Sequence, residues 1–216
     1  MSARRAASRA AELAVIERGE LMLADLRAAL DKLEIPFFLI QGTCLGAIRD
    51  RGFVQGERDI DLGCLFEDLR GKQDALIHEL WAQAFHVRPI IEPFDQPRAL
   101  SVYKHGMKAD IVGFIHHERN RVNLSPVDSA SVGDKPYGIV FPDEIMEDFV
   151  EVVCWGSSWR VPAQTHRYLE LEYGETWKQP RPKDVKSRAR VYRYISKHKL
   201  LRQKETFLHA QSEPTA

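Results

Sequence analysis

The sequence predicts an α+β fold in which a mixed sheet is flanked by helices. Apolar residues recur at helical spacing over residues 6–33 and 68–85. A third helix is predicted over 163–173, where Pro162 precedes the helix and Gly174 ends it. Short apolar runs, separated by prolines and glycines, lie between these helices and are typical of strands. We therefore expect one mixed sheet, with C-terminal helices that close a cleft.

Length and composition favour one globular domain. The 216 residues are enough for a well-packed core, and 44% hydrophobic with 29% charged residues is ordinary for a soluble protein. The 31 basic residues balance the 31 acidic residues, which gives no overall attraction to nucleic acid or to an anionic membrane. We expect a single domain over residues 1–180 and a basic helical tail over 181–216 that is disordered at its end.

The cysteines and the apolar runs bear on location. Cys44, Cys64 and Cys154 are widely spaced, which favours inert thiols in a reducing compartment. The sequence has no apolar run of the roughly 18 residues that a membrane-spanning helix needs. The N-terminus lacks the apolar stretch of a secretory signal. These features predict a cytoplasmic protein.

The predicted N-terminal helix, residues 6–33, leads through Ile35 and Pro36 into a first strand at 37–40. A turn at Gly42 and Thr43 and a short helix follow, and the next apolar run opens with Asp59-Ile60-Asp61-Leu62. The order is therefore strand, turn, helix and strand.

Two carboxylates begin the second strand. Side chains alternate between the two faces of a strand, so Asp59 and Asp61 point to the same side. Carboxylates this close repel each other unless a cation lies between them, and oxygen ligands suit magnesium or manganese. An isolated Asp-x-Asp is more often a solvated strand end. Here the rest of the strand is apolar, so the acids at its head need a reason to be there.

The turn at Gly42 and Thr43 supplies a complementary feature. Backbone N–H groups at the start of a helix favour anions, and a glycine lets a phosphate approach closely. The turn and the Asp-x-Asp together predict a site for a phosphate and a metal ion.

Strands are predicted at 87–91, 99–103 and 107–115, and the last of them contains Asp110. An isolated acid within a strand is destabilising unless it is paired, exposed or bound to metal, and the pattern leaves these alternatives open. His116 and His117 end this strand but point to opposite faces, so we expect no zinc site.

The C-terminal third is predicted to contain a hairpin, with strands at 149–153 and 158–161. Trp155 and Gly156 form its turn. After the helix at 163–173, the rings of Tyr173 and Trp177 either stack on a base or sugar or anchor the helix end. The segment 178–204 is rich in Lys and Arg. It suggests a basic amphipathic helix that is able to contact an anionic surface, and a solvated helix is the alternative.

Several of these segments together resemble the LicD/fukutin family, which has a nucleotidyltransferase fold related to that of DNA polymerase beta. The resemblance lies in GTCLGAIR at 42–49, GFV at 52–54 and DIDL at 59–62. Downstream, KADIV at 108–112 looks like the strand that brings the third carboxylate. Phe141-Pro142, WRVP at 159–162 and YLELEYGETW at 168–177 look like the C-terminal pattern of the family. The resemblance covers roughly residues 36–180.

The resemblance implies a metal-dependent transferase. Such enzymes move a phospho-alcohol, of the phosphocholine or polyol phosphate type, from a CDP-activated donor to a hydroxyl group of a glycan or another acceptor. It also implies that Asp59 and Asp61 hold Mg²⁺ or Mn²⁺ across the diphosphate. Asp110 then holds a second metal ion or acts as the base for the hydroxyl group.

In this mechanism Gly42 and Thr43 bind phosphate through the turn, Arg49 pairs with the phosphate, and Arg51 and Arg58 are further helpers. One segment departs from the family. Members often read Pro-Trp-Asp-Asp-Asp-Ile-Asp where residues 55–61 of this chain read QGERDID, so the two matched aspartates are kept and the rim of the cleft differs.

Three other functions remain open from the sequence. The first is a nucleotidyltransferase that keeps the nucleotide on the acceptor and releases pyrophosphate. The second is a non-catalytic module that binds a nucleotide or glycan. The third is an RNA-binding protein led by the basic tail, for which binding should depend steeply on salt.

Overall fold

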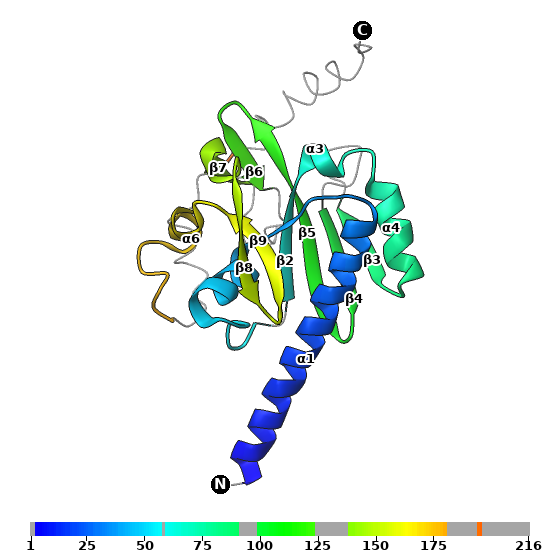
Figure 1. The fold of residues 1–216 in the computed structure, drawn as a ribbon, viewed down its shortest axis with the longest axis vertical. Helices are drawn as coiled ribbons and strands as arrows, with labels where there is room; N and C mark the ends of the chain where they lie inside the picture. The colour runs from blue at the N-terminus through cyan, green and yellow to red at the C-terminus, as the bar shows by residue number, and fades with distance from the viewer. Residues whose placement is uncertain (1–2, 58, 91–98, 124–137, 181–193, 196–216) are drawn as a thin grey trace.

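The computed structural model describes residues 3–57, 59–90, 99–123, 138–180 and 194–195. It begins with the long helix α1 (Ala3–Lys32), which corresponds to the helix predicted over 6–33. The C-terminal half of α1 crosses the sheet, and its N-terminal half extends away from the rest of the molecule (Figure 1). Leu23, Leu26 and Leu30 of the crossing half are buried, so the helix is held by apolar contacts with the core.

The described residues form an eight-stranded mixed sheet, which confirms the predicted α+β class. The parallel pair β2 and β5 lies within it, and the other strand pairs are antiparallel. Strand β5 is long enough to pair with β2 and β4 along its first part and with β6 near its end. The strands of this sheet are β1 (Phe38–Leu39), β2 (Asp59–Leu65), β3 (His86–Ile90), β4 (Ala99–Lys104), β5 (Met107–His117), β6 (Asn120–Asn123), β7 (Gly138–Pro142) and β10 (Tyr194–Ile195).

The remaining helices are short. Helix α2 (Gln41–Leu45) continues into the π-helical turn η1 (Gly46–Asp50), and a 3-10 turn, η2 (Asp143–Ile145), follows β7. The single helix predicted over 68–85 is instead two helices, α3 (Phe66–Leu69) and α4 (Gln73–Ala82). Gly71, with φ of 77°, lies between them, and this left-handed conformation breaks the helix. Helix α6 (Thr165–Tyr173) corresponds to the helix predicted over 163–173.

A chain of aromatic rings joins the sheet to α6. Phe38 of β1 contacts Phe114 of β5 at 5.5 Å between ring centroids, and Phe114 contacts Phe141 of β7 at 5.9 Å. Phe141 in turn contacts Tyr168 of α6 at 5.3 Å. A Cβ atom on Gly63 of β2 would lie 2.6 Å from the Phe38 ring and 2.9 Å from the Phe114 ring. The absence of a side chain at Gly63 therefore leaves room for the Phe38 and Phe114 rings.

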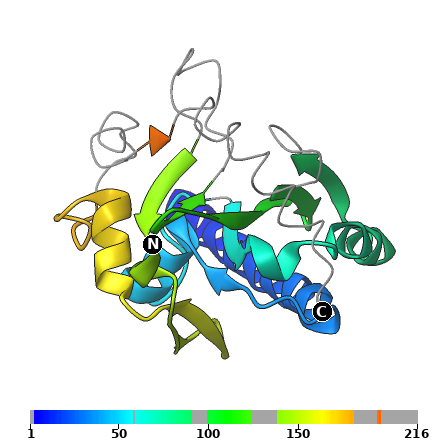
Figure 2. The ribbon, with the colours of Figure 1, turned by 90° about the horizontal axis from the view of Figure 1, so that it is seen from above.

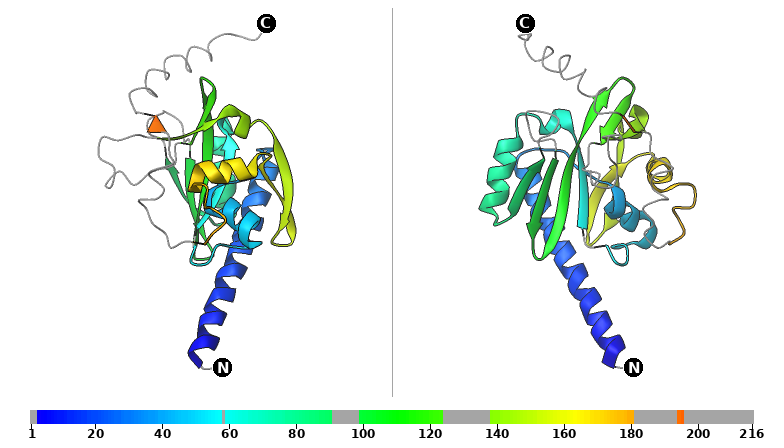
Figure 3. Two further views of the ribbon diagram at one scale, coloured as in Figure 1. Left: turned by 90° about the vertical axis from the view of Figure 1, so that its left-hand side faces the viewer. Right: turned by 180° about the vertical axis from the view of Figure 1, so that it is seen from behind.

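The predicted hairpin forms a separate two-stranded sheet of β8 (Phe149–Cys154) and β9 (Ser157–Pro162). Its turn residues Trp155 and Gly156 have φ of 48° and 66°, as a tight hairpin turn requires. The Arg27 guanidinium of α1 lies over the Trp159 ring, 3.8 Å from the centroid, and donates to the Ser158 carbonyl. The views in Figures 2 and 3 show the hairpin beside the main sheet, next to α1.

The predicted C-terminal tail falls largely outside the described residues. Tyr194 and Ile195 are the part of it that the structure describes, and they form β10 against β7. These two residues are extended, which differs from the basic helix expected over 178–204. Pairing with the free edge of β7 supplies backbone hydrogen bonds that a periodicity argument does not detect.

Candidate active site

The parallel pair brings the three predicted carboxylates together. Asp59 and Asp61 begin β2, and Asp61 is the register partner of Asp110 on β5. Paired residues of neighbouring strands point to the same face, so all three carboxyl groups lie on one face of the sheet. The strand alternation that predicted the Asp59 and Asp61 pair therefore extends across to Asp110.

Asp61 is the most constrained member of this group. It is buried, with 9% of its surface exposed. Burial, followed by the charges of Asp59, Asp110, Glu57 and Glu172, raises the pKa of Asp61 well above its usual range. A buried carboxylate among like charges is stable only with a bound proton or a bound cation.

Glu57 and Glu172 are members of the site that the sequence analysis did not identify. Glu172 is fully buried on α6, one turn after the buried Tyr168. The sequence signal that could have identified Glu172 is an acidic residue on the apolar, buried side of a predicted helix. Glu57 lies in the segment that departs from the family pattern, and a Cβ atom on Gly42 would lie 3.4 Å from its Cδ. Glu57 thus lies close to Gly42, and its charge acts on Asp61.

Asp110 is held by two neighbours. The Ser101 hydroxyl of β4 donates to Asp110 Oδ1 at 2.6 Å, and Lys108 Nζ donates to Oδ2 at 2.6 Å. Burial opposes the charge of Lys108, but the hydrogen bond to Asp110 and the charges of Asp110 and Asp59 raise the pKa of Lys108 overall. Lys108 therefore stays positively charged beside the acids. Both partners were overlooked in the sequence, although Lys108 lies two residues before Asp110 on the same face of the strand.

The predicted phosphate turn lies directly beside the acids. The Thr43 hydroxyl accepts a hydrogen bond of 2.8 Å from the Asp61 backbone N–H, and the Gln41 N–H donates to the Tyr168 hydroxyl at 2.8 Å. These bonds tie the start of α2 to β2 and to α6. The first N–H groups of a helix have no acceptor within the helix, so those of Gly42 and Thr43 are suited to an anion.

The three arginines predicted to assist differ in position. Arg49 makes two hydrogen bonds to the Asp50 carboxylate, at 2.8 and 2.7 Å, and a third to the Trp177 carbonyl at 3.3 Å. Arg51 is exposed, and its charge acts on the Cys154 thiol near the hairpin turn. Arg58 lies outside the described residues. The structure thus places Arg49 at the junction of η1 with the segment after α6.

Trp177 is buried, and its ring contacts His166 edge-on at 5.4 Å. This position favours the alternative in which Trp177 anchors the end of α6.

The cysteines also behave as structural residues. Burial raises the pKa of Cys44, and it raises the pKa of Cys64 to about 12, so both thiols stay protonated at neutral pH.

The donor set fits a hard divalent cation, because it consists of carboxylate oxygens crowded around a buried member. Within the described ranges, however, no three His, Cys, Asp or Glu side chains are already arranged around a common metal position. In this structure Asp110 Oδ2 accepts from the Lys108 ammonium group instead.

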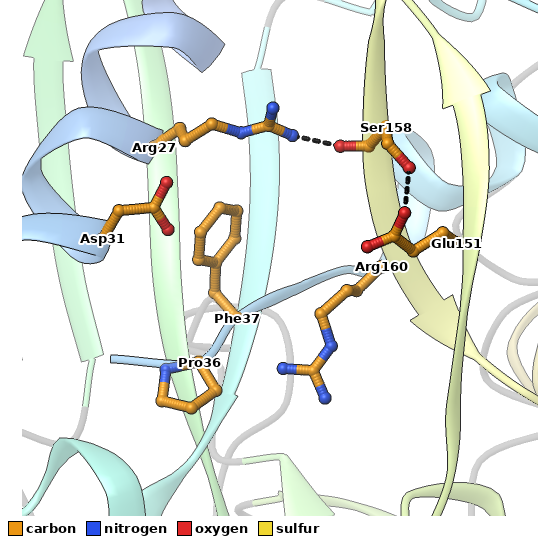
Figure 4. A pocket seen from close by; sticks show the side chains of 7 residues that line it. All are labelled: Arg27, Asp31, Pro36, Phe37, Glu151, Ser158 and Arg160. Carbon is orange, nitrogen blue, oxygen red and sulfur yellow. Dashed lines mark hydrogen bonds between the residues drawn. The ribbon is translucent and has the colours of Figure 1, made fainter. Parts of the chain in front are cut away.

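Two pockets lie elsewhere, between α1 and the hairpin. One, of about 310 Å³, is drawn in Figure 4, where Asp31 and Arg160 face it from opposite walls. The other, of about 270 Å³, is lined by Trp155 and Trp159, and Arg27 borders both pockets. Asp59, Asp61 and Asp110 line neither of these two pockets, so the candidate site is identified by its chemistry and not by cavity size. No helix of the described chain has the length and apolarity to span a membrane.

Comparisons with known proteins agree with the sequence resemblance. The chain is 29% identical over 153 residues to ribitol-5-phosphate transferase FKTN of Macaca fascicularis, which covers 70% of this chain and 31% of the relative. It is 28% identical over 166 residues to the protein of the same name from Mus musculus, covering 76% and 34%. The chain thus spans about a third of the length of these curated relatives. No family model matches the chain.

Among solved structures, the antibiotic-resistance factor ANT(2'')-Ia aligns over 91% of this chain and 95% of its own, with 14% identity and a TM-score of 0.46. The lincomycin-bound lincosamide antibiotic adenylyltransferase LnuA aligns over 80% of this chain and 92% of its own, with 11% identity and a TM-score of 0.45.

Proposed function

We propose that this chain acts as a metal-dependent transferase, which moves a phospho-alcohol from a CDP-activated donor to a hydroxyl group of a glycan or another acceptor. The observation that carries the proposal is the convergence of Asp59, Asp61 and Asp110 on one face of the parallel strands. The similarity to proteins named ribitol-5-phosphate transferases supports a phospho-alcohol as the transferred group. The cytidine nucleotide follows from the LicD/fukutin resemblance.

Asp59 and Asp61 would hold Mg²⁺ or Mn²⁺, and Asp110 would hold a second ion or accept the proton of the acceptor hydroxyl. When bound, such an ion neutralises the diphosphate and makes its phosphorus more open to attack. The burial of Asp61 among other acids supports this role, because a cation would relieve the repulsion that raises its pKa.

The other residues would position the donor. The N–H groups of Gly42 and Thr43 would bind phosphate oxygens, while the Thr43 hydroxyl keeps the turn in register with Asp61. The acceptor oxygen would then attack the phosphorus distal to the nucleoside. The bond to the bridging oxygen would break, CMP would leave, and the alcohol phosphate would stay on the acceptor.

The products of the reaction test this proposal. The protein would be incubated with Mg²⁺, a glycan extract and either CDP-alcohols (CDP-ribitol, CDP-choline and CDP-glycerol) or the triphosphates CTP and ATP. Phosphorus NMR would follow CMP and pyrophosphate. We expect CMP from a CDP-alcohol, a loss of more than about a hundredfold in Asp61→Asn, and little change in Asp74→Asn on the exposed side of α4.

Other products would favour other functions. Pyrophosphate from a triphosphate, with no CMP from any CDP-alcohol, would favour a nucleotidyltransferase. Tight nucleotide binding without turnover would favour a binding module.

A further inference from the structure

Lys108 occupies a position among the acids that the proposed chemistry does not explain. It is the register partner of Asp59 across the parallel pair, and it precedes Asp110 by two residues on β5. Its ammonium group lies 2.6 Å from Asp110 Oδ2. The Lys108 ammonium group therefore occupies Asp110 Oδ2, an oxygen for which a metal ion at Asp110 would have to compete, and the charge of Asp59 also acts on it.

The two oxygens of Asp110 are held differently. Oδ1 accepts from the Ser101 hydroxyl, which carries no charge and is buried on β4. Oδ2 accepts from Lys108, whose side chain is 36% exposed. A cation approaching Oδ2 would be repelled by the ammonium group, and the long flexible stem of a lysine lets that group move without a backbone change.

We propose that Lys108 is a resident counter-ion that holds the metal position at Asp110 until the donor arrives. On arrival of a nucleoside diphosphate with its metal ion, the ammonium group leaves Oδ2 and binds a phosphate oxygen. Oδ2 becomes free to bind the ion, and Oδ1 stays fixed by Ser101. This inference rests on the proposed function, since it assumes a diphosphate donor at the carboxylates.

The proposal predicts a coupling between two ligands. Metal binding alone must break the Lys108 ion pair without compensation, whereas metal binding with a diphosphate gives the ammonium group a new partner. The diphosphate should therefore strengthen metal binding by more than its own direct contact with the ion, and the coupling is reciprocal. Replacing Lys108 with a neutral residue should therefore remove the share of this coupling that comes from the ammonium group.

The experiment titrates Mn²⁺ into the full chain by calorimetry, with and without CDP, for the wild type, Lys108→Met and Lys108→Gln. We expect Lys108→Met to bind Mn²⁺ alone about tenfold more tightly, because a charge-assisted hydrogen bond no longer has to be broken. We also expect CDP to strengthen Mn²⁺ binding less in this variant than in the wild type. Lys104→Met is the matched control, since Lys104 pairs with Asp25 of α1 and not with the cluster.

The outcomes separate this inference from the proposed function. A smaller effect of CDP in both Lys108 variants, with Lys104→Met like the wild type, supports it. If all three proteins bind Mn²⁺ and CDP strengthens the binding equally in the wild type and both Lys108 variants, the proposed role of Lys108 is wrong. The metal site itself is then retained. No Mn²⁺ binding in any variant, with or without CDP, overturns both.

Discussion

Asp61 belongs to the candidate site, but its ionised form lowers the stability of the folded protein. Its pKa is raised well above the usual range, so the folded chain binds its proton more tightly than the unfolded chain does. The resulting stability is complete below the pKa of an unfolded aspartate, and it is lost as the pH rises through the raised folded value. We expect the metal-free protein to melt at lower temperature as the pH rises through this window.

Melting curves in EDTA across this pH range would measure the effect. Asp61→Asn cannot ionise, so its melting temperature should fall less with pH, with about 2–4 °C for each 1 kcal/mol recovered. If the melting temperatures of the wild type and the variant fall equally with pH, ionisation of Asp61 is not the cause of the fall. Excess Mg²⁺ should raise the melting temperature of the wild type at high pH and leave the melting temperature of the variant nearly unchanged.

Gly42 is a second test at the residue scale. A Cβ atom there would lie 3.4 Å from Glu57 Cδ, which is ordinary contact, but the branched methyl groups of valine would reach further. We expect Gly42→Val to weaken binding of CDP with Mg²⁺ by about tenfold or more, and Gly42→Ala to weaken it much less. Titration calorimetry would decide, and unchanged affinity in a folded Gly42→Val protein would move the phosphate site away from this turn.

At the scale of elements, Gly63 controls how β1, β2 and β5 pack. A Cβ atom on this residue would lie 2.6 Å from Phe38, 2.8 Å from Ile40 and 2.9 Å from Phe114. We expect Gly63→Ala to lower the free energy of unfolding by about 1–3 kcal/mol, because a packed core has no room for the methyl group. Urea denaturation would measure it. Gly52→Ala is the control, since its added Cβ would meet nothing closer than 4.0 Å.

Periodicity predicted the elements better than it predicted their partners. Alternation along β2 placed Asp59 and Asp61 on one face, and the family pattern selected Asp110, which the register then set beside Asp61. Local sequence carries no information on which distant side chains meet. The proximity of Glu172 on α6 to the aspartates was therefore not predicted, although an acid on the buried side of a helix could have indicated a special role.

Hydrogen bonds between neighbouring strands were equally hidden. The partner of Asp110 across β4, Ser101, depends on a register that only the folded sheet defines. The extended Tyr194 and Ile195 depend on the free edge of β7, which local basic composition does not report. The break at Gly71, in contrast, was visible in the sequence as a glycine within a helical pattern.

For the whole molecule, the order of the strands separates β10 from the site. The path β1-β2-β5-β6-β7-β10 places β10 at the far end from β2. We expect a chain truncated after Pro180 to bind Mn²⁺ within about twofold of the full chain, because no site carboxylate lies beyond that residue. Calorimetry would test this. A large loss of Mn²⁺ affinity in a folded truncated chain would mean that the tail contributes to the site.

The parallel pairing of β2 with β5 also affects how fast the chain can fold. Parallel strands need a long connection, and here α3, α4, β3 and β4 all lie between them, so this pair closes a long loop. Its closure drives Asp61 against Asp110, and the repulsion opposes the final contact. We expect stopped-flow refolding to be faster in Mg²⁺ than in EDTA, and Asp61→Asn to refold at a rate that Mg²⁺ does not change. Equal wild-type rates in both buffers would contradict this. The Mg²⁺ ion that we propose for the transfer reaction would then also speed the folding of the chain.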